Sequence, residues 1–417
     1  MTQLDDVIRE NARGGPAVPS VCSAHPDVLA ASLRLAEELD RVVVIEATSN
    51  QVNQFGGYTG MTPAGFVAFV HQICTETGTS PNRVIFGGDH LGPQAWKKEP
   101  AEEAMAKART MMADYVKAGF TKIHLDCSEG CAGEPGAVGD DLAAARAAEL
   151  AQVCEKNAPD PAALRYIIGT EVPPPGGARS DDDHIAPTPP ERAQATLDAH
   201  DAAFAKLGLN EAWAKVRGLV LQPGLEFAPA HLDHFDMEQP DHLSPLLKGR
   251  DLLCFEAHST DYQKDAVYPD LARRHFAILK VGPALTYAWR EALYALSHIH
   301  VWQSGAPHIS TEMERLMLAN PGYWQGHLHG DAARQHQLRH FGYADRIRYY
   351  WPQATGPIHT MLEALADNTP PAPLLEQYIP RDTLTRAANL PLSWPQAILQ
   401  AHVQRMLLPY FAEPTQT

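Results

Sequence analysis

The sequence has 417 residues, of which 45% are hydrophobic and 20% charged, and its formal net charge is −16. This composition is typical of a folded globular protein and excludes a disordered or fibrous one. The negative charge also argues against a nucleic-acid-binding protein, because such proteins need clustered Lys and Arg to neutralise phosphates. Any anionic substrate must therefore meet a few local cations.

The first fifteen residues, MTQLDDVIRENARGG, lack the basic start and the apolar stretch of a signal peptide. No apolar run in the sequence is long enough to cross a bilayer. The six cysteines are not spaced as paired zinc knuckles, and we interpret them as reduced thiols. We therefore expect a cytoplasmic protein that does not enter a membrane.

Short apolar runs rich in β-branched residues recur along the chain, and stretches with helical periodicity separate them. Helix-start signals lie in two of these stretches, where Thr62 and Thr188 have the pattern of N-cap residues, each followed by a proline. Eight strands that alternate with helices predict a (β/α)₈ barrel. A doubly wound open sheet is the alternative, but no G-x-G-x-x-G follows the first run. The eight runs are 19–25, 42–50, 84–92, 122–128, 166–172, 218–224, 252–259 and 277–283.

Residues 301–417 have a different character from the barrel region, which we place at 1–300. No Gly/Ser-rich linker precedes them, so we expect a helical C-terminal extension packed on the barrel rather than an independent domain. The Arg-Tyr cluster DRIRYYWP (345–352) within it is expected to serve packing or subunit contact.

Polar residues occur at every second position near the carboxyl ends of the predicted strands. Because side chains alternate between the two faces of a strand, these residues would share the barrel interior. Barrel enzymes keep their active sites at this end. The interior set comprises Glu46, Thr48, Asn50, His124, Asp126, Ser128, Glu171, Gln222, Glu256, His258 and Lys280.

Imidazole and carboxylate groups in this set are typical ligands of zinc or manganese. His90, in GGDHLG (87–92), and His258, in FEAHS (255–259), are the best imidazole candidates, because the barrel would bring their strand ends together. Glu171 and Asp126 are carboxylate candidates. The alternative is that either histidine is an ordinary hydrogen-bonded residue.

Carboxylates that do not bind the metal could move protons, and the candidates are Asp89, Asp126 and Asp261. Asp89 could instead support a ligand histidine, and Asp261 could be a cap or turn residue. Lys280 could neutralise an oxyanion or a phosphate, form a Schiff base, or pair with an interior glutamate. Residues expected to bind substrate are Glu46, Asn50, Ser128, Gln222 and Lys280.

Several long motifs occur in an order and at a spacing that resemble the GatZ/KbaZ family of tagatose-bisphosphate aldolase subunits. The resemblance covers nearly the whole chain and implies a TIM barrel related to the zinc-dependent class II aldolases. The motifs are VCSAHP, IEATSNQVNQFGGYTGMTP, GGDHLGP, KIHLDCS, IGTEVPPPGGA, FEAHSTDYQ, AILKVGPALTYAWREAL and YADRIRYYWP.

The resemblance implies roles for single residues. GGDHLG is similar to the aldolase signature in which the Asp handles a proton and the His binds zinc, so Asp89 and His90 take these roles. FEAHS is similar to the strand that delivers another zinc ligand, His258, and KVGPALTYAWREAL to a segment that contacts substrate phosphate and hydroxyls. The third aldolase ligand is a histidine after the fifth strand, where this chain has Glu171.

Two functions follow from the resemblance. Family members are described as non-catalytic partners that stabilise a class II tagatose-1,6-bisphosphate aldolase, and some relatives act alone as C4-epimerases that interconvert fructose and tagatose or their phosphates. We favour a metal-dependent C4-epimerase of a ketohexose or its phosphate, with zinc expected and manganese or nickel as alternatives, because burying unpaired polar groups in a scaffold would cost several kcal/mol. The aldolase partner is the second hypothesis. We also expect a homo-oligomer.

Overall fold

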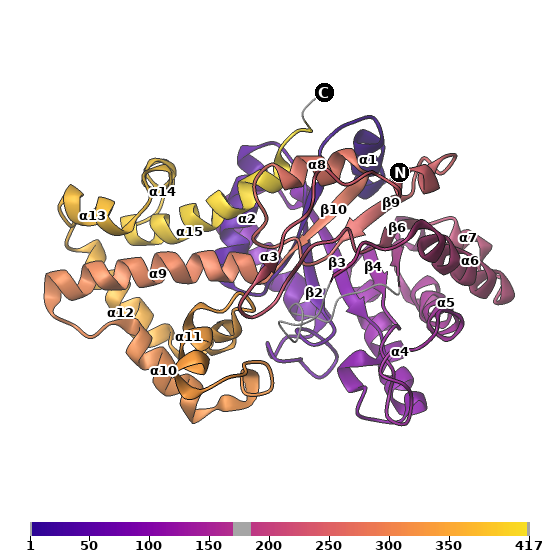
Figure 1. The fold of residues 1–417 in the computed structure, drawn as a ribbon, viewed down its shortest axis with the longest axis horizontal. Helices are drawn as coiled ribbons and strands as arrows, with labels where there is room; N and C mark the ends of the chain where they lie inside the picture. Colours follow the sequence, from indigo (N-terminus) through magenta and orange to yellow (C-terminus); the bar gives the residue numbers. More distant parts are fainter. Residues whose placement is uncertain (1, 170–184, 415–417) are drawn as a thin grey trace.

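The computed structural model describes residues 2–169 and 185–414 and has a closed parallel barrel at its centre (Figure 1). The strand order around the barrel is β1-β10-β9-β6-β5-β4-β3-β2. Each predicted apolar run overlaps one barrel strand, which confirms the (β/α)₈ barrel. The strands are β1 (Val18–Cys22), β2 (Val43–Thr48), β3 (Val84–Leu91), β4 (Lys122–Leu125), β5 (Arg165–Ile168), β6 (Val216–Val220), β9 (Cys254–Ala257) and β10 (Phe276–Val281).

Helices cover the outside of the barrel, and a two-stranded hairpin, β7 (Glu226–Phe227) and β8 (Leu232–Asp233), lies between β6 and β9. Helix α1 (Gln3–Ala12) precedes the first strand. The helices between strands and after the last strand are α2 (Pro26–Glu38), α3 (Pro63–Thr77), α4 (Ala101–Ala118), α5 (Asp140–Asn157), α6 (Pro190–Lys206), α7 (Asn210–Trp213), α8 (Val267–Arg273) and α9 (Pro283–Ser304).

The two predicted helix starts have different outcomes. The Thr62 hydroxyl accepts the backbone N–H of Gly65 at 3.3 Å, so Thr62 caps α3 as predicted. Pro189, not Thr188, is the N-cap of α6. The prediction for Thr188 is wrong because its hydroxyl accepts the backbone N–H of Gln222, at 2.9 Å, and so ties the start of α6 to the end of β6.

The amino end of the barrel is closed by α1. Leu4 and Ile8 of this helix are buried against side chains from the barrel strands, among them Val44, Ile85 and Ile278. Apolar side chains of α1 and of the strands therefore pack together at this end of the barrel.

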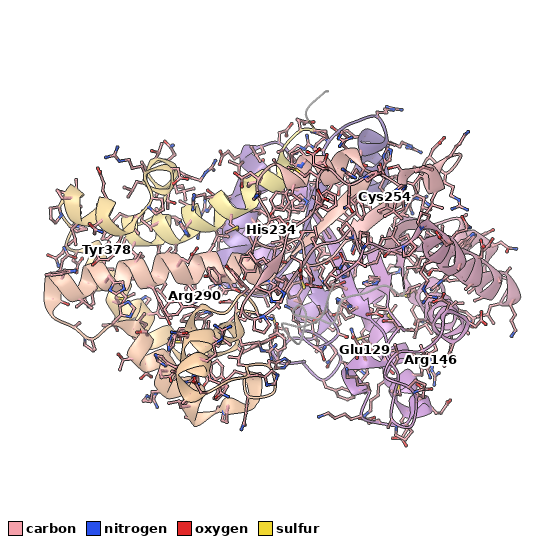
Figure 2. The ribbon with its side chains drawn as sticks, in the orientation of Figure 1. Glu129, Arg146, His234, Cys254, Arg290 and Tyr378 are labelled. Carbon is pink, nitrogen blue, oxygen red and sulfur yellow. The ribbon has the colours of Figure 1, made fainter. Side chains whose placement is uncertain are left out.

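The C-terminal extension is helical, as predicted, and lies to one side of the barrel (Figure 1). Figure 2 labels Tyr378 at its far end. Helix α9 continues through residue 300, so the expected division between barrel and extension falls within a helix and stays a prediction. The helices after α9 are α10 (Ile309–Ala319), α11 (Ala332–Phe341), α12 (Thr355–Ala366), α13 (Ala372–Tyr378), α14 (Arg381–Ala387) and α15 (Trp394–Leu407).

The last part of the extension packs against the barrel. Helix α15 runs beside α9 and α2, and the Gln404 amide donates to the carbonyl oxygen of Ala31 on α2 at 3.2 Å (Figure 1). The Tyr410 hydroxyl donates to the backbone oxygen of Thr260, in the loop after β9, at 3.0 Å. No helix within residues 2–169 and 185–414 is long and apolar enough to span a membrane.

Candidate active site

The carboxyl end of β3 departs from the regular strand. Its pairing register with β4 shifts between Gly88 and Leu91, so β3 carries one more residue than β4 over this stretch. A bulge of this kind re-aims the side chains beside it. The consecutive residues Asp89 and His90 are both buried and both contact interior groups, although adjacent residues of a regular strand would face opposite sides.

The bulge holds His90 in a strained backbone conformation. Its φ is 46°, in the left-handed region that residues other than glycine seldom adopt. Such a conformation costs of order 1 kcal/mol and persists only when neighbouring groups fix it. The His90 carbonyl oxygen accepts hydrogen bonds from the Ser49 hydroxyl and from the Gln94 amide, both at 2.9 Å.

Three histidines from different strands meet inside the barrel. His90 lies on β3, His124 on β4 and His258 directly after β9, and each is at most 2% exposed. The distances between their ring centroids are 5.3 Å for His90–His124, 5.1 Å for His90–His258 and 5.2 Å for His124–His258. The barrel therefore brings His90 and His258 together, as expected, and adds His124.

Asp89 lies at the centre of this cluster. Its Oδ1 is 2.9 Å from Nδ1 of His124, its Oδ2 is 3.6 Å from Nε2 of His90, and it forms an ion pair with Lys280. Burial alone would raise the pKa of Asp89, but the charges of His90 and Lys280 and the His124 hydrogen bond hold that pKa well below its usual value. Asp89 is therefore a carboxylate anion at neutral pH.

His90 forms a second carboxylate pair, with Asp126. Its Nδ1 is 2.7 Å from Asp126 Oδ2, and Asp126 Oδ1 accepts both the hydroxyl of Ser128, at 2.6 Å, and its backbone N–H, at 3.1 Å. Burial would raise the pKa of Asp126, but the hydrogen bond and charge of His90 lower it overall. An anionic carboxylate at Nδ1 orients the imidazole and leaves Nε2 directed toward Asp89.

A buried ion-pair network lies next to the histidines. Lys122 Nζ contacts Glu46 and is 2.8 Å from Glu256 Oε2, and Glu256 Oε1 is 2.9 Å from His258 Nε2. Gly87 on β3 provides the space for this network, because a Cβ there would lie only 2.8 Å from the Cγ of Glu46. Glu46, an expected substrate-binding residue, is thus paired with a buried lysine.

Four of these residues can hold a metal ion. Asp89, His124, Glu256 and His258 each offer a ligand atom within 4.8 Å of the others. Within the described part of the chain, Nε2 of His124 and Nδ1 of His258 are buried and have no hydrogen-bond partner. Buried nitrogen atoms without a partner are costly, and imidazole nitrogens are common metal ligands. The residues therefore fit a metal ion.

The charges of the interior also fit a divalent cation. Burial and the nearby Lys280 charge hold the pKa of His258 well below its usual value, so this ring is neutral, as a ligand must be. Four carboxyl groups share this interior with only two lysines, so a bound cation would be stabilised by the excess of acidic groups. The charged groups are Glu46, Asp89, Asp126, Glu256, Lys122 and Lys280.

Other expected site residues lie elsewhere or have local partners. Asp261 Oδ1 accepts the backbone N–H groups of Gly282 and Ala284, at 3.0 and 2.8 Å, at the start of α9, which is the cap geometry of the alternative interpretation. Burial raises the pKa of Asp261 to about 6. Asn50 is exposed. Glu171, the expected third metal ligand, lies outside the described residues.

Two further expected substrate-binding residues hold local structure. Gln222 Oε1 accepts the backbone N–H groups of Gly224 and Leu225, at 2.8 and 2.9 Å, and so closes the turn after β6. The Ser128 hydroxyl donates a hydrogen bond to Asp126 Oδ1 and so fixes that carboxylate. Lys280 is 12% exposed along its side chain, more than Asp89 and the three histidines, which are at most 2% exposed.

The sequence contained signals for the residues that we did not assign. The sequence predicts His124 and Glu256 as interior positions but does not single them out as ligands. Each is two residues before a residue that we did assign, Asp126 and His258, and therefore on the same face of its strand. Lys122, two residues before His124, follows the same rule and was missed.

A closed parallel barrel with an acid and histidine cluster at the carboxyl ends of its strands defines the class of (β/α)₈ enzymes. The sequence model of the family described as D-tagatose-1,6-bisphosphate aldolase subunit GatZ/KbaZ-like matches residues 4–414. The chain belongs to this family, which confirms the family inferred from the motifs.

Two relatives are similar over almost their whole length. A protein of Agrobacterium fabrum (strain C58 / ATCC 33970) named D-tagatose 6-phosphate 4-epimerase is 47% identical, over 98% of this chain and 97% of its own. A crystal structure described as a probable tagatose 6 phosphate kinase from Sinorhizobium meliloti 1021 is 42% identical, with a TM-score of 0.86, and covers 95% of this chain and 99% of its own.

Proposed function

We propose that this protein is a metal-dependent C4-epimerase that interconverts tagatose 6-phosphate and fructose 6-phosphate. The observation that carries the proposal is the buried cluster of Asp89, His90, His124 and His258, in which Nε2 of His124 and Nδ1 of His258 have no hydrogen-bond partner among the described residues. The relative named D-tagatose 6-phosphate 4-epimerase supports the choice of reaction. We expect zinc in this site, with manganese or nickel as alternatives.

The chemistry of the substrate favours cleavage over direct proton removal. The C4 hydrogen is too far from the C2 ketone for loss of its proton to give a carbonyl-stabilised carbanion. If a base removes the O4 proton, the C3–C4 bond can break, its electron pair forms an enediolate across C2 and C3, and C4 becomes an aldehyde. Rotation of the aldehyde, re-formation of the bond and return of the proton to O4 invert C4 without any net redox change.

His90 is the residue best suited to hold the O4 proton. Asp126, fixed by Ser128, binds its Nδ1 and so keeps Nε2 available as the accepting nitrogen. The imidazolium that results is stabilised by two carboxylates, since Asp126 lies at one nitrogen and Asp89 at the other. The same ring returns the proton after the aldehyde has rotated.

The remaining residues stabilise negative charge. Asp89, His124, Glu256 and His258 would hold the divalent ion, which when bound polarises the C2 carbonyl and stabilises an adjacent oxyanion. Lys280 is charged at neutral pH, because Asp89 raises the pKa of its ammonium group against the effect of burial. Its partly exposed side chain is suited to bind a substrate oxygen.

A second candidate is a non-catalytic subunit that stabilises a class II aldolase, which the description of the family favours. Phosphorylation of the sugar phosphate is a third reaction, favoured only by the description of the Sinorhizobium protein. A stabilising subunit does not require the nitrogens of His124 and His258 that have no partner among the described residues, which argues against the second candidate. A buried cluster of proton-transfer groups suits cleavage of the carbon chain better than phosphoryl transfer, which argues against the third.

The test is an assay of the purified protein alone. The protein is stripped of metal, resupplied with Zn²⁺, Mn²⁺ or Ni²⁺, and given tagatose 6-phosphate, and the formation of fructose 6-phosphate is followed. We expect activity that depends on the metal and is lost in His124→Ala and His258→Ala. His359→Ala is the matched control, because this histidine is 71% exposed on α12 of the extension.

Three outcomes would reject the proposal. ADP formation from ATP without epimerisation would identify a kinase. Cleavage of tagatose 1,6-bisphosphate that appears only when a class II aldolase is added would identify the stabilising subunit. Epimerisation that survives in both His124→Ala and His258→Ala would remove this cluster from the reaction.

A further inference from the structure

Residues 343–353 of the extension are anchored at the carboxyl end of the barrel. The backbone N–H of Tyr343 donates to the oxygen of Pro229, between β7 and β8, at 3.1 Å, and the Tyr262 hydroxyl, from the loop after β9, donates to the Tyr343 oxygen at 2.6 Å. The 3₁₀ helix Arg346–Gln353 follows directly. This segment therefore contacts loops at the carboxyl end of the barrel, where the active-site residues lie.

Asp345 fixes the turn that leads into this 3₁₀ helix. Its φ is 43°, and its carboxylate accepts the Thr286 hydroxyl at 2.6 Å and the Arg290 Nε–H at 3.2 Å. Both partners lie on α9, where Figure 2 labels Arg290. The strained turn and its two partners hold the next residues in a defined position.

Two arginines follow this turn and share one aromatic ring. The guanidinium carbons of Arg346 and Arg348 lie 4.7 and 4.5 Å from the centroid of the Tyr349 ring. The Nε–H of Arg346 donates to the Tyr323 oxygen at 2.6 Å, and Nη2 of Arg348 donates to the Tyr349 hydroxyl at 2.9 Å. Nη1 and Nη2 of Arg346 donate no hydrogen bond within the described ranges.

Neither arginine has an acidic partner among the described residues. Every other buried arginine in the described part of the chain forms an ion pair with a carboxylate, whereas Arg346, which is 9% exposed, does not. Arg348 is half-buried, and its Nη1 donates to the backbone oxygens of Ala344 and Asp345. The nearby carboxylate of Asp345 is already held by Arg290 and Thr286. A buried guanidinium without an acid, such as that of Arg346, is costly unless an anion binds it.

The aromatic ring that the two arginines share contacts a loop at the carboxyl end of the barrel, and the charge of Arg348 reaches the end of β1. The positive charges of Arg348 and Lys280 both act on the thiol of Cys22 at the end of β1, where they oppose the rise in its pKa that burial causes. Lys280 is in turn the ion-pair partner of Asp89. The ring of Tyr58, from the loop after β2, contacts Tyr349 with centroids 5.0 Å apart, and Tyr58 is 41% exposed.

We infer that Arg346 and Arg348 bind the phosphate group of the substrate, so that the C-terminal extension selects a ketohexose phosphate over a free ketohexose. Guanidinium groups suit this role, because their N–H donors match the geometry of phosphate oxygens and keep their charge at any physiological pH. Arg346 offers Nη groups that have no hydrogen bond among the described residues, and the charge of Arg348 acts on Cys22 together with that of Lys280. The inference rests on the proposed function only for the identity of the sugar.

The experiment separates phosphate binding from catalysis. Arg346→Gln, Arg348→Gln and Arg348→Lys are compared with Arg13→Gln, a control that removes an exposed positive charge from the loop after α1. For each protein, kcat/KM is measured on tagatose 6-phosphate and on free tagatose, and the shift in thermal midpoint caused by inorganic phosphate is recorded. We expect the ratio of the two kcat/KM values to fall at least thirtyfold in both Gln variants, mainly through KM, and the phosphate-induced shift to disappear.

Arg348→Lys should recover part of both signals, because it keeps the charge but not the forked donor, and Arg13→Gln should match the wild type. Equal losses on both sugars, or a phosphate-induced shift that persists in the Gln variants, would overturn the inference. If no sugar is epimerised by any form, but the phosphate shift is present in the wild type and absent from the Gln variants, the anion site stands and the proposed reaction fails.

Discussion

The two ends of the barrel use buried charge in opposite ways. At the amino end, Asp5 of α1 is fully satisfied, since Oδ1 accepts the Nε–H groups of Arg165 and Arg217 at 2.7 and 2.6 Å and Oδ2 accepts from Arg165 and from the Thr2 backbone. At the carboxyl end, one nitrogen of His124 and one of His258 have no hydrogen-bond partner in the described part of the chain. We call Asp5, Arg165 and Arg217 the closed network, because it stabilises the fold. We call the cluster of Asp89 and the histidines the open network, because it leaves ligand atoms free.

This difference predicts that the ends respond differently to substitution. Removal of a partner from the closed network leaves an uncompensated buried charge and lowers the free energy of unfolding. Removal of a group from the open network relieves repulsion or strain that the fold tolerates for function, so activity falls while stability changes little.

The largest effect is expected at the carboxyl end. Asp89→Asn removes the anion that contacts His124, His90 and Lys280, and we expect kcat/KM to fall about a thousandfold, equal to about 4 kcal/mol of transition-state stabilisation. The content of bound metal should fall in parallel, as measured by elemental analysis. Unfolding by denaturant should shift little. A variant that loses both stability and activity would place Asp89 among the structural residues.

The second effect is expected at the amino end. Asp5→Ala leaves Arg165 and Arg217 buried without an acid, and we expect the free energy of unfolding to fall by about 4 kcal/mol while kcat/KM of the folded protein is retained. Asp6→Ala is the matched control, because its side chain is 70% exposed. A similar loss of stability in both variants would show that α1, rather than the ion pair, is sensitive to substitution.

The sequence predicts most of what is local at either end. Runs of apolar β-branched residues mark the eight strands, and the two-residue period places His124, Asp126, Glu256 and His258 on interior faces. These signals depend only on near neighbours in the chain. The fold class and the region of the site could therefore be predicted.

Features that the sequence does not predict depend on contacts between distant segments or on a break in the two-residue period of a strand. The bulge at His90 turns two consecutive side chains inward, which a regular strand forbids. Asp5 meets arginines 160 and 212 residues away. The position of Arg348 at the barrel follows from the return of the extension, and the sequence indicated only packing or subunit contact for that cluster.

The third effect contrasts the pH dependence of the two ends. Burial raises the pKa of Asp261 to about 6 in the folded protein, above the unfolded value of 3.8, so its stabilising contribution is present below pH 4 and is lost as the pH rises through 6. The loss amounts to about 3 kcal/mol. Asp261→Asn keeps an oxygen for the amides of α9 but removes the charge. The difference in unfolding free energy, variant minus wild type, should therefore increase between pH 4 and 7.

Asp5 should show the opposite sign. Burial would raise the pKa of its carboxyl, but the hydrogen bonds and charges of Arg165 and Arg217 hold it below 3.8. Its contribution is therefore present above pH 4 and is lost as the pH falls further. Denaturant titrations of Asp5→Asn and Asp261→Asn at pH 3.5, 5 and 7 measure both slopes. Parallel slopes would contradict the contrast between the two ends.

The smallest expected effect tests how much the orientation of His90 depends on the hydrogen bond from Ser128 to Asp126. Ser128 is a positioning residue, since its hydroxyl donates to Asp126 Oδ1 at 2.6 Å while Asp126 Oδ2 holds His90. Ser128→Ala leaves the backbone N–H bond to the same oxygen at 3.1 Å, so only part of the restraint is lost. We expect kcat to fall about tenfold, equal to about 1.4 kcal/mol, with KM nearly unchanged.

Ser128→Thr keeps the hydroxyl and should restore most of the lost kcat. This rescue distinguishes the hydrogen bond from packing, because Ala is smaller and Thr is larger than Ser, and a packing role would make both variants slow. A Ser128→Ala variant whose KM rises while kcat is retained would instead place Ser128 in direct contact with substrate, as the sequence alone suggests. The split between kcat and KM thus decides whether Asp126 needs its hydroxyl partner to hold His90 in the orientation that proton transfer requires.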